Sequence, residues 1–135
     1  KLNSLEYSFI KSRLEVFYEK IPIQSVREFK ARLNENKSIE NIYGLALAHS
    51  KNNKHKESEK LINILLEEYP TNLFLNTSKV EILTKSKKYE SALSLVNKFL
   101  EISPRNYPLS VAKSKLLLQM ERYYESEEIL YYFYG

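Results

Sequence analysis

Two eight-residue phrases, "LLEEYPTN" at 65–72 and "FLEISPRN" at 99–106, follow one pattern. Each reads as an apolar residue, Leu, Glu, two further residues, Pro, a polar residue and Asn. Their prolines, Pro70 and Pro104, are 34 residues apart. A fixed period of this length is typical of repeat proteins, in which one unit buries its apolar face only by stacking on its neighbours.

The same period extends in both directions from the two phrases. Small residues recur at Ser58, Ala92 and Ser126, each three positions after the rings of His55, Tyr89 and Tyr123. Upstream of each set lies a second stretch with helical character: "IENIYGLALAHSK", "LFLNTSKVEILTKS" and "YPLSVAKSKLLLQM". A small side chain lets two antiparallel helices approach closely, so the unit is predicted to be a helical hairpin that crosses at the small residue.

The ends of the hairpins are predicted by their turn residues. Pro70 and Pro104 cannot continue a helix interior, so each is expected to follow the end of a second helix. Asn72 and Asn106 are good N-caps for the helix that comes next. The repeat therefore reads as helix, short turn, helix and Pro-containing turn.

Composition supports an all-α chain. The 135 residues include Gly 2 and Pro 4, while Leu, Glu, Lys, Ala and Ser fill the long stretches. We predict one domain over 1–135, with a degenerate hairpin at 1–38 and repeats at 39–72, 73–106 and 107–135, the last incomplete. In the degenerate part, Leu5, Phe9, Leu14, Val16 and Phe17 recur at helical spacing, and Pro22 precedes a face with Val26, Phe29 and Leu33.

This unit resembles the tetratricopeptide repeat, which has 34 residues, a small residue near slot 20 and Pro at slot 32. Pro70 and Pro104 hold slot 32, whereas Lys79 and Lys113 hold slot 7, which is usually apolar. The resemblance implies a right-handed α-α superhelix, a solenoid of about four hairpins with seven to eight helices. It also implies a role in protein–protein interaction.

Three stretches resemble a narrower family: "FIKSRLEVF" (9–17), "IPIQSVREFKARL" (21–33) and "YGLALAHSKNNKHKESEKLI" (43–62). They are similar to the C-terminal repeat region of bacterial zinc metalloproteases of the beta-barrel assembly-enhancing type. In that family a Val-Lys-Ala-Arg-Leu helix is followed by Pro-x-x-Ala-Val-x-x-Phe and Tyr-Gly-Leu-Ala-Leu helices. The matching residues here are Lys11, Arg13, Leu14, Pro22, Val26, Phe29 and 43–47, with Ser12 and Ser25 in place of alanine.

That resemblance implies a non-catalytic docking segment of a periplasmic or exported protease. Its partners would be an N-terminal protease domain, a substrate or the outer-membrane assembly machinery, and zinc would belong to the protease domain. The alternative is a stand-alone adaptor, in the periplasm or the cytoplasm, that binds a helical or extended peptide. An upstream His-Glu-x-x-His helix would distinguish the two.

The sequence offers no motif for catalysis or cofactor binding within this chain. His49 and His55 lie six apart and occupy repeat slots held elsewhere by Leu or Tyr, so both are predicted to be packing residues. Cys 0 excludes thiolate metal sites, and no glycine-rich loop is possible with Gly44 and Gly135 alone. The charge of +4 is interleaved, which favours a solvated surface over nucleic-acid binding, and no run of about 18 apolar residues predicts membrane insertion.

Candidate partner-binding residues come from the first helix of each unit, because these helices line the inner face of a tetratricopeptide stack. They are Tyr43, Leu47, Phe74, Thr77, Glu81, Val111 and Lys115. Their mixture of rings, apolar side chains and isolated charges suits a helix or an extended segment with apolar anchors. Packing of the same residues against a further domain is an equal alternative.

The last stretch, "YYESEEILYYFYG", places many aromatic residues in a terminal helix. A solenoid normally ends with a polar cap, so this composition has three possible explanations. The chain continues beyond this point, the helix packs on another subunit, or the helix folds into the last groove.

Overall fold

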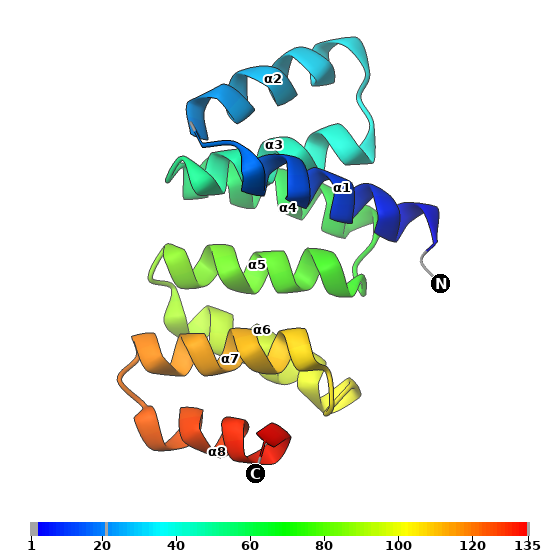
Figure 1. Cartoon of the computed structure of the whole chain (residues 1–135). Helices are drawn as coiled ribbons and strands as arrows, with labels where there is room; N and C mark the ends of the chain where they lie inside the picture. The colour runs from blue at the N-terminus through cyan, green and yellow to red at the C-terminus, as the bar shows by residue number, and fades with distance from the viewer. Residues whose placement is uncertain (1–2, 21, 135) are drawn as a thin grey trace. The chain divides into compact units, whose positions relative to one another are not determined.

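A computed structural model describes residues 3–20 and 22–134, and eight helices with no strand make up this part of the chain (Figure 1). The helices are α1 (Ser4–Tyr18), α2 (Pro22–Glu35), α3 (Ile39–Lys51), α4 (His55–Glu68), α5 (Leu73–Lys85), α6 (Tyr89–Ile102), α7 (Tyr107–Gln119) and α8 (Tyr123–Tyr134). The predicted all-α class, with about four successive helix pairs, is confirmed. Residues 1, 2, 21 and 135 of the predicted 1–38 and 107–135 segments lie outside the described residues.

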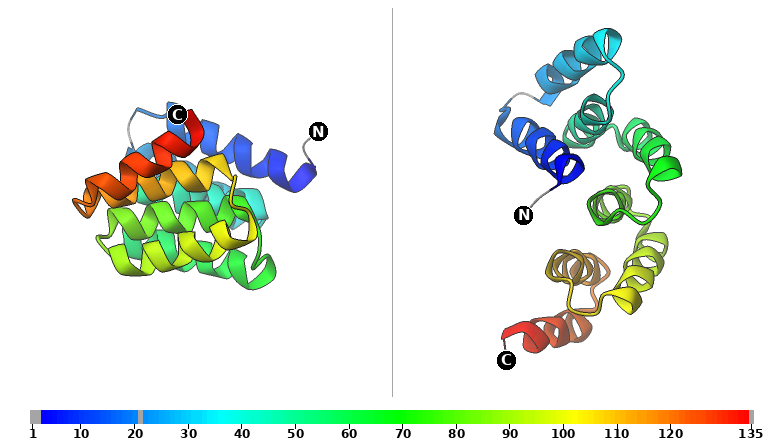
Figure 2. Two further views of the ribbon diagram at one scale, coloured as in Figure 1. Left: turned by 90° about the horizontal axis from the view of Figure 1, so that it is seen from below. Right: turned by 90° about the vertical axis from the view of Figure 1, so that its right-hand side faces the viewer.

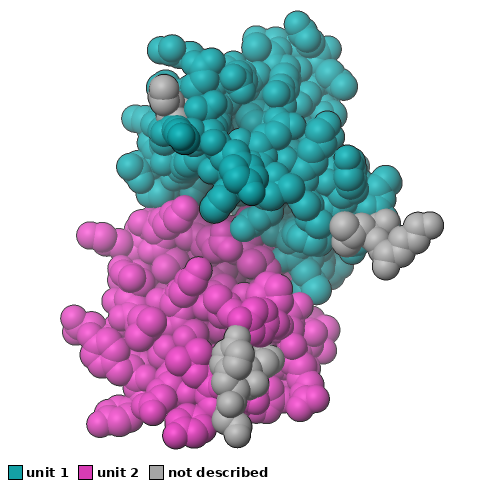
Figure 3. Space-filling view, viewed as in Figure 1, with its two compact units in different colours: residues 1–75 teal, residues 76–135 magenta. Residues whose placement is uncertain are grey.

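The chain divides into two compact units, residues 1–75 and residues 76–135, which Figure 3 shows in separate colours. The boundary falls within α5, so its first turn belongs to unit 1 and the remainder to unit 2. Each unit is described on its own below.

The 34-residue period of the sequence is present in the helix boundaries. Helices α3, α5 and α7 begin after Ser38, Asn72 and Asn106, whose side-chain oxygens accept backbone N–H bonds from Asn41, Leu75 and Leu109 at 3.2, 3.1 and 3.0 Å. The predicted Asn caps are therefore confirmed. Pro70 and Pro104 each lie two residues beyond the end of a helix, as expected for residues that cannot continue it.

The short turns inside the repeats are also equivalent. Asn53, Lys87 and Glu121 have φ angles of 60°, 62° and 61°. In each case the next residue donates its N–H to a carbonyl of the preceding helix, such as Lys54 to His49 at 2.8 Å. This left-handed residue closes the first helix and reverses the chain into the second.

The small residues lie at helix crossings, as the sequence predicts. Ser58 of α4 is fully buried and donates to the carbonyl of Ala46 on α3 at 2.6 Å. In unit 2, Ser126 of α8 and Ser114 of α7 have their hydroxyl oxygens 2.7 Å apart. Ala92 takes the equivalent place in the core of unit 2 with no hydroxyl to satisfy.

In unit 1, helix α3 is the common packing partner of α1, α2 and α4, which surround it in the right-hand view of Figure 2. The two helices of the predicted 1–38 hairpin thus pack chiefly on α3. The closest approach is at Gly44, where a Cβ would overlap the Phe29 ring. Two of the motifs behind the family resemblance therefore meet, one supplying the ring and the other the space for it.

The buried side of α1 differs from the one expected. Phe9, Ser12 and Val16 are buried, whereas Leu14 and Phe17 are 50% and 73% exposed. Helical spacing places residues 9, 12 and 16 on one face, and the hydroxyl of Ser12 is satisfied by donating to the Glu40 carbonyl at 2.9 Å. Counting apolar letters alone selected the wrong side because α1 is apolar on both.

Lys51, the last residue of α3, closes the C-terminal end of α1. Its ammonium donates to the carbonyls of Val16 at 2.7 Å, Phe17 at 3.2 Å and Glu19. The last carbonyls of a helix have no partner within the helix and carry partial negative charge, so a cation there satisfies both requirements.

Replacing Lys51 by methionine is expected to destabilise unit 1 by about 1–3 kcal/mol, because several charge-assisted hydrogen bonds are lost together. Urea unfolding followed by circular dichroism measures the change. Lys54→Met, at an exposed position three residues later, is the matched control and should change the midpoint little. An unchanged midpoint for Lys51→Met would show that solvent caps α1 equally well.

None of the helices in the described part of the chain combines the length and apolar character needed to cross a bilayer.

Candidate functional site

The structure places three of the candidate residues in unit 1. Tyr43 is fully buried, with its ring 4.7 Å from that of Phe9, and its hydroxyl accepts a hydrogen bond from Arg13 at 3.2 Å. Phe74 is half-buried, and its ring lies 6.2 Å from Phe9. Leu47 is half-buried against the cluster of α2 and α3. Tyr43 and Phe74 are thus brought together around a residue of α1.

The other four candidates lie in unit 2, on two helices. Thr77 and Glu81 are half-buried on α5, and Val111 is half-buried on α7. Lys115 is exposed on α7. Partner binding by these residues remains a prediction.

Both histidines have a buried Nδ1 atom with no hydrogen-bond partner. His49 is itself buried, as are Leu83 and Leu117 at its repeat slot, which agrees with a packing role. Burial, followed by the positive charge of Lys30 and Lys54, lowers the pKa of His49 from its usual value of 6.5, while Glu57 opposes the shift. No group of three or more possible metal ligands occurs in the residues that the structure describes.

Unit 1 is expected to lose stability as the pH falls below about 6.5. The lowered pKa of His49 means that the unfolded chain takes up the proton more readily than the folded one, so stability present above pH 6.5 is lost on acidification. Thermal melts between pH 7.5 and 5 measure this slope. His49→Leu, which copies the sister repeats, should flatten it. An equally steep loss in His49→Leu would assign the slope to other groups.

A cavity of about 350 Å³ lies in unit 2 between the end of α6, one side of α7 and one side of α8. It is bordered by Leu100, Pro104, Ser110, Lys113, Leu117, Glu125, Glu128, Ile129 and Tyr132. This size admits one or two side chains of a bound segment. Apolar walls with a few converging polar groups are what a binding site for such a segment requires.

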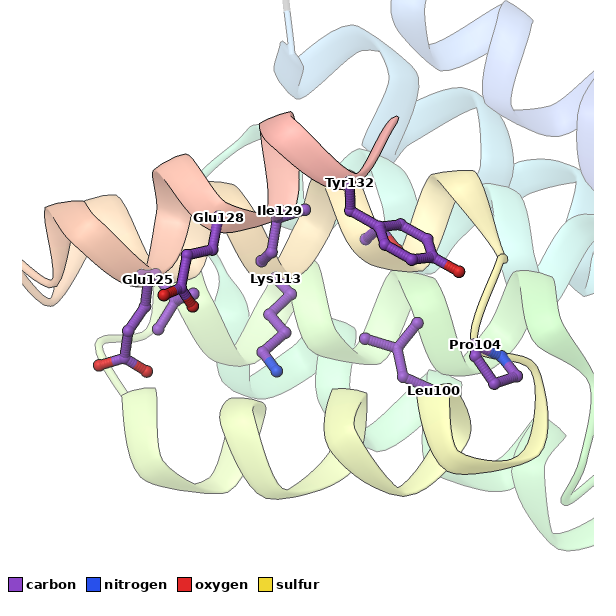
Figure 4. Close-up of a pocket in the computed structure, with 9 residues that line it drawn as sticks. Leu100, Pro104, Lys113, Glu125, Glu128, Ile129 and Tyr132 are labelled. Atoms are coloured by element: carbon purple, nitrogen blue, oxygen red, sulfur yellow. The ribbon is translucent and has the colours of Figure 1, made fainter. Parts of the chain in front are cut away.

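The polar and apolar borders of this cavity lie at different ends (Figure 4). Glu125 and Glu128 of α8 lie toward one end, and Leu100, Pro104 and Tyr132 lie toward the other. The Lys113 side chain extends from α7 between the two groups. We call these the acidic end and the apolar end of the pocket.

Two arginines order the borders of the pocket. Arg122 donates to both carboxylate oxygens of Glu125, each at 2.7 Å, and this hydrogen bonding, with a smaller contribution from Lys113, lowers the pKa of Glu125. At the other end, Arg105 donates to the Tyr132 hydroxyl at 3.1 Å and lies 5.7 Å from its ring centre. The acidic end therefore keeps its negative charge at neutral pH, and Tyr132 is held over the apolar end.

Helix α8 adds an exposed aromatic face beside the pocket. Tyr124 is 86% exposed, and Tyr131 and Tyr132 are also largely exposed. The side chains of Phe133 and Tyr134, which belong to the same aromatic stretch, lie outside the described ones. Exposed rings of this density are characteristic of contact surfaces.

Sequence reasoning did not find this pocket, although one signal was present. Lys113 stands at a slot that is usually apolar, and that departure marks the residue that extends into the cavity. The residues from α6 and α8 follow no separate motif, because each also fits a solvated helix face.

Chemically, the pocket can hold an apolar side chain at one end and make hydrogen bonds and ion pairs through Lys113 and Glu128 at the other. Comparison of the chain with protein-family models, with curated proteins and with solved structures finds no match.

Proposed function

We propose that this chain is a non-catalytic protein-interaction module of tetratricopeptide-like helical hairpins. Its partner presents a segment with an apolar anchor side chain. The observation that carries the proposal is the pocket of unit 2, where an apolar end, an acidic end and Lys113 converge beside the exposed rings of α8. A binding mode with one apolar anchor and a few polar contacts is common in peptide recognition.

Peptides selected from a random phage-displayed library against the full chain provide the probe, and two lysines of α7 locate the site. Lys113 borders the pocket, whereas Lys115 belongs to the face predicted from the repeat pattern. The two side chains diverge because successive helical residues are rotated by about 100°. Lys113→Ala is expected to weaken binding of the selected peptide about tenfold, with Lys115→Ala binding like the wild type.

Circular dichroism first establishes that both variants keep their helicity. The opposite result, with binding lost in Lys115→Ala and kept in Lys113→Ala, would reject the pocket in favour of the inner face. Failure to select any peptide that competes with its own soluble form would contradict the interaction role.

The resemblance to beta-barrel assembly-enhancing zinc metalloproteases supports a finer proposal. In it, the module is the docking part of an exported, periplasmic protease, and zinc is held by another part of that protein. The contact between Phe29 and Gly44 favours this reading because it unites two of the resembling motifs in one packing arrangement. Sequencing of the intact natural protein tests it. A His-Glu-x-x-His helix upstream would support a protease, and its absence would leave a stand-alone adaptor.

A further inference from the structure

Helix α1 covers part of the face that the repeat pattern assigns to a partner. The Phe9 ring lies 4.7 Å from Tyr43 and 6.2 Å from Phe74, two of the predicted partner-binding residues. Lys11 forms an ion pair of 3.1 Å with Glu40, the first acidic residue of α3. Figure 1 shows α1 running across α3, so this contact extends along much of the helix.

The contacts of α1 repeat at the spacing of a helix bound in a groove. Phe9, Ser12 and Val16 are the buried residues, which correspond to positions i, i+3 and i+7. Arg13, at i+4, donates to the Tyr43 hydroxyl. Anchors at i, i+3, i+4 and i+7 define the recognition of an amphipathic helix by a helical surface.

Helix α1 also has the properties of a separate ligand. Its N-terminus carries a complete capping box, in which Asn3 and Glu6 each accept a hydrogen bond from the other's backbone N–H, at 2.9 and 3.1 Å. In the core cluster that includes Phe29 and Leu45, Val16 is the one buried residue from α1, and α2 and α3 supply the others. The core formed by α2, α3 and α4 thus depends little on α1.

We propose that the inner face of α3, with the start of α5, is a helix-binding surface that α1 occupies in the free protein. The foreign occupant is an amphipathic helix with an aromatic anchor, a small residue three positions later, an arginine one position further and a β-branched residue at the seventh position. Such a helix would displace α1 and take over its contacts with Tyr43, Phe74 and Glu40. This surface belongs to unit 1 and is independent of the pocket in unit 2.

The test uses the chain's own helix as the probe. A labelled peptide of residues 3–20 is titrated into the full wild-type chain and into full-length Phe9→Ala, in which the surface is intact but the built-in helix lacks its anchor. Occupation by α1 reduces apparent affinity by the fraction of chains in which the surface is open. Phe9→Ala is therefore expected to bind the peptide at least tenfold more tightly than the wild type.

Two controls fix the register of the complex. A peptide that itself carries Phe9→Ala should bind neither chain. Glu40→Lys in the Phe9→Ala chain should weaken the wild-type peptide several-fold, and a Lys11→Glu peptide should restore the loss. A folded Phe9→Ala chain that fails to bind the wild-type peptide would overturn the proposal. So would a dimer that exchanges α1 between copies, because the occupant would then be a second chain.

Native-state hydrogen exchange of the wild-type chain provides a second measurement if Phe9→Ala does not fold. Amides of α1 are expected to exchange through a partial opening, with at least tenfold less protection than those of α3. Equal protection of α1 and α3, with the same dependence on denaturant, would make α1 an integral part of the core and reject the proposal. Loss of peptide binding in the unit 2 pocket would leave this result unaffected.

Discussion

Replacing Tyr43 by alanine is expected to destabilise unit 1 by about 3–5 kcal/mol, the range for truncating a large buried aromatic residue. The ring is fully buried against Phe9, so its removal leaves a cavity and an unpaired Arg13 donor. Urea unfolding followed by circular dichroism measures the loss. The same change would alter binding without altering stability if Tyr43 were a solvent-exposed contact residue.

Tyr43→Phe separates the ring from the hydroxyl. It keeps the contact with Phe9 and removes the hydrogen bond from Arg13, so a cost of only about 1 kcal/mol is expected. A wild-type midpoint for Tyr43→Ala would contradict the packing of α1 on α3. It would also restore Tyr43 as an accessible binding residue.

Gly44→Ala is expected to destabilise the chain, although alanine favours a helix over glycine by about 1 kcal/mol. The added Cβ overlaps the ring of Phe29, which is 2% exposed and has little room to move. Overpacking of this kind costs about 1–3 kcal/mol, and it exceeds the gain in helix propensity when the ring cannot shift. Thermal and urea unfolding of the single variant determine the sign.

The double variant Gly44→Ala with Phe29→Leu identifies the cause. A smaller side chain at position 29 should recover part of the loss, so the two substitutions should be non-additive. Stabilisation by Gly44→Ala alone, or strict additivity with Phe29→Leu, would show that α2 and α3 do not approach as closely as the structure has them.

Much of the hairpin architecture was predictable because it depends on local chemistry. Caps at Asn72 and Asn106, helix ends before Pro70 and Pro104 and the small residue Ser58 each follow from one residue and its neighbours. Repetition at 34 residues tested each assignment more than once. The periodic signal therefore compensated for the weakness of any single residue's preference.

The arrangement of α1 and the pocket was not predictable, since both depend on contacts distant in sequence. Leu14 and Phe17 suggest a buried face as strongly as Phe9 and Val16, and only the placement of α3 decides between them. Likewise, Lys113 becomes a pocket residue because α6 and α8 lie on either side of it. No property of Lys113 alone distinguishes it from the exposed Lys115.

Chemical-shift mapping of the isotope-labelled full chain with a selected peptide tests the interaction role most directly. The account predicts shifts concentrated at the pocket, with Ser110, Lys113 and Ile129 among the most affected and the core around Ala92 unchanged. Shifts that avoid α7 and α8, or no saturable shifts from any selected peptide, would contradict it.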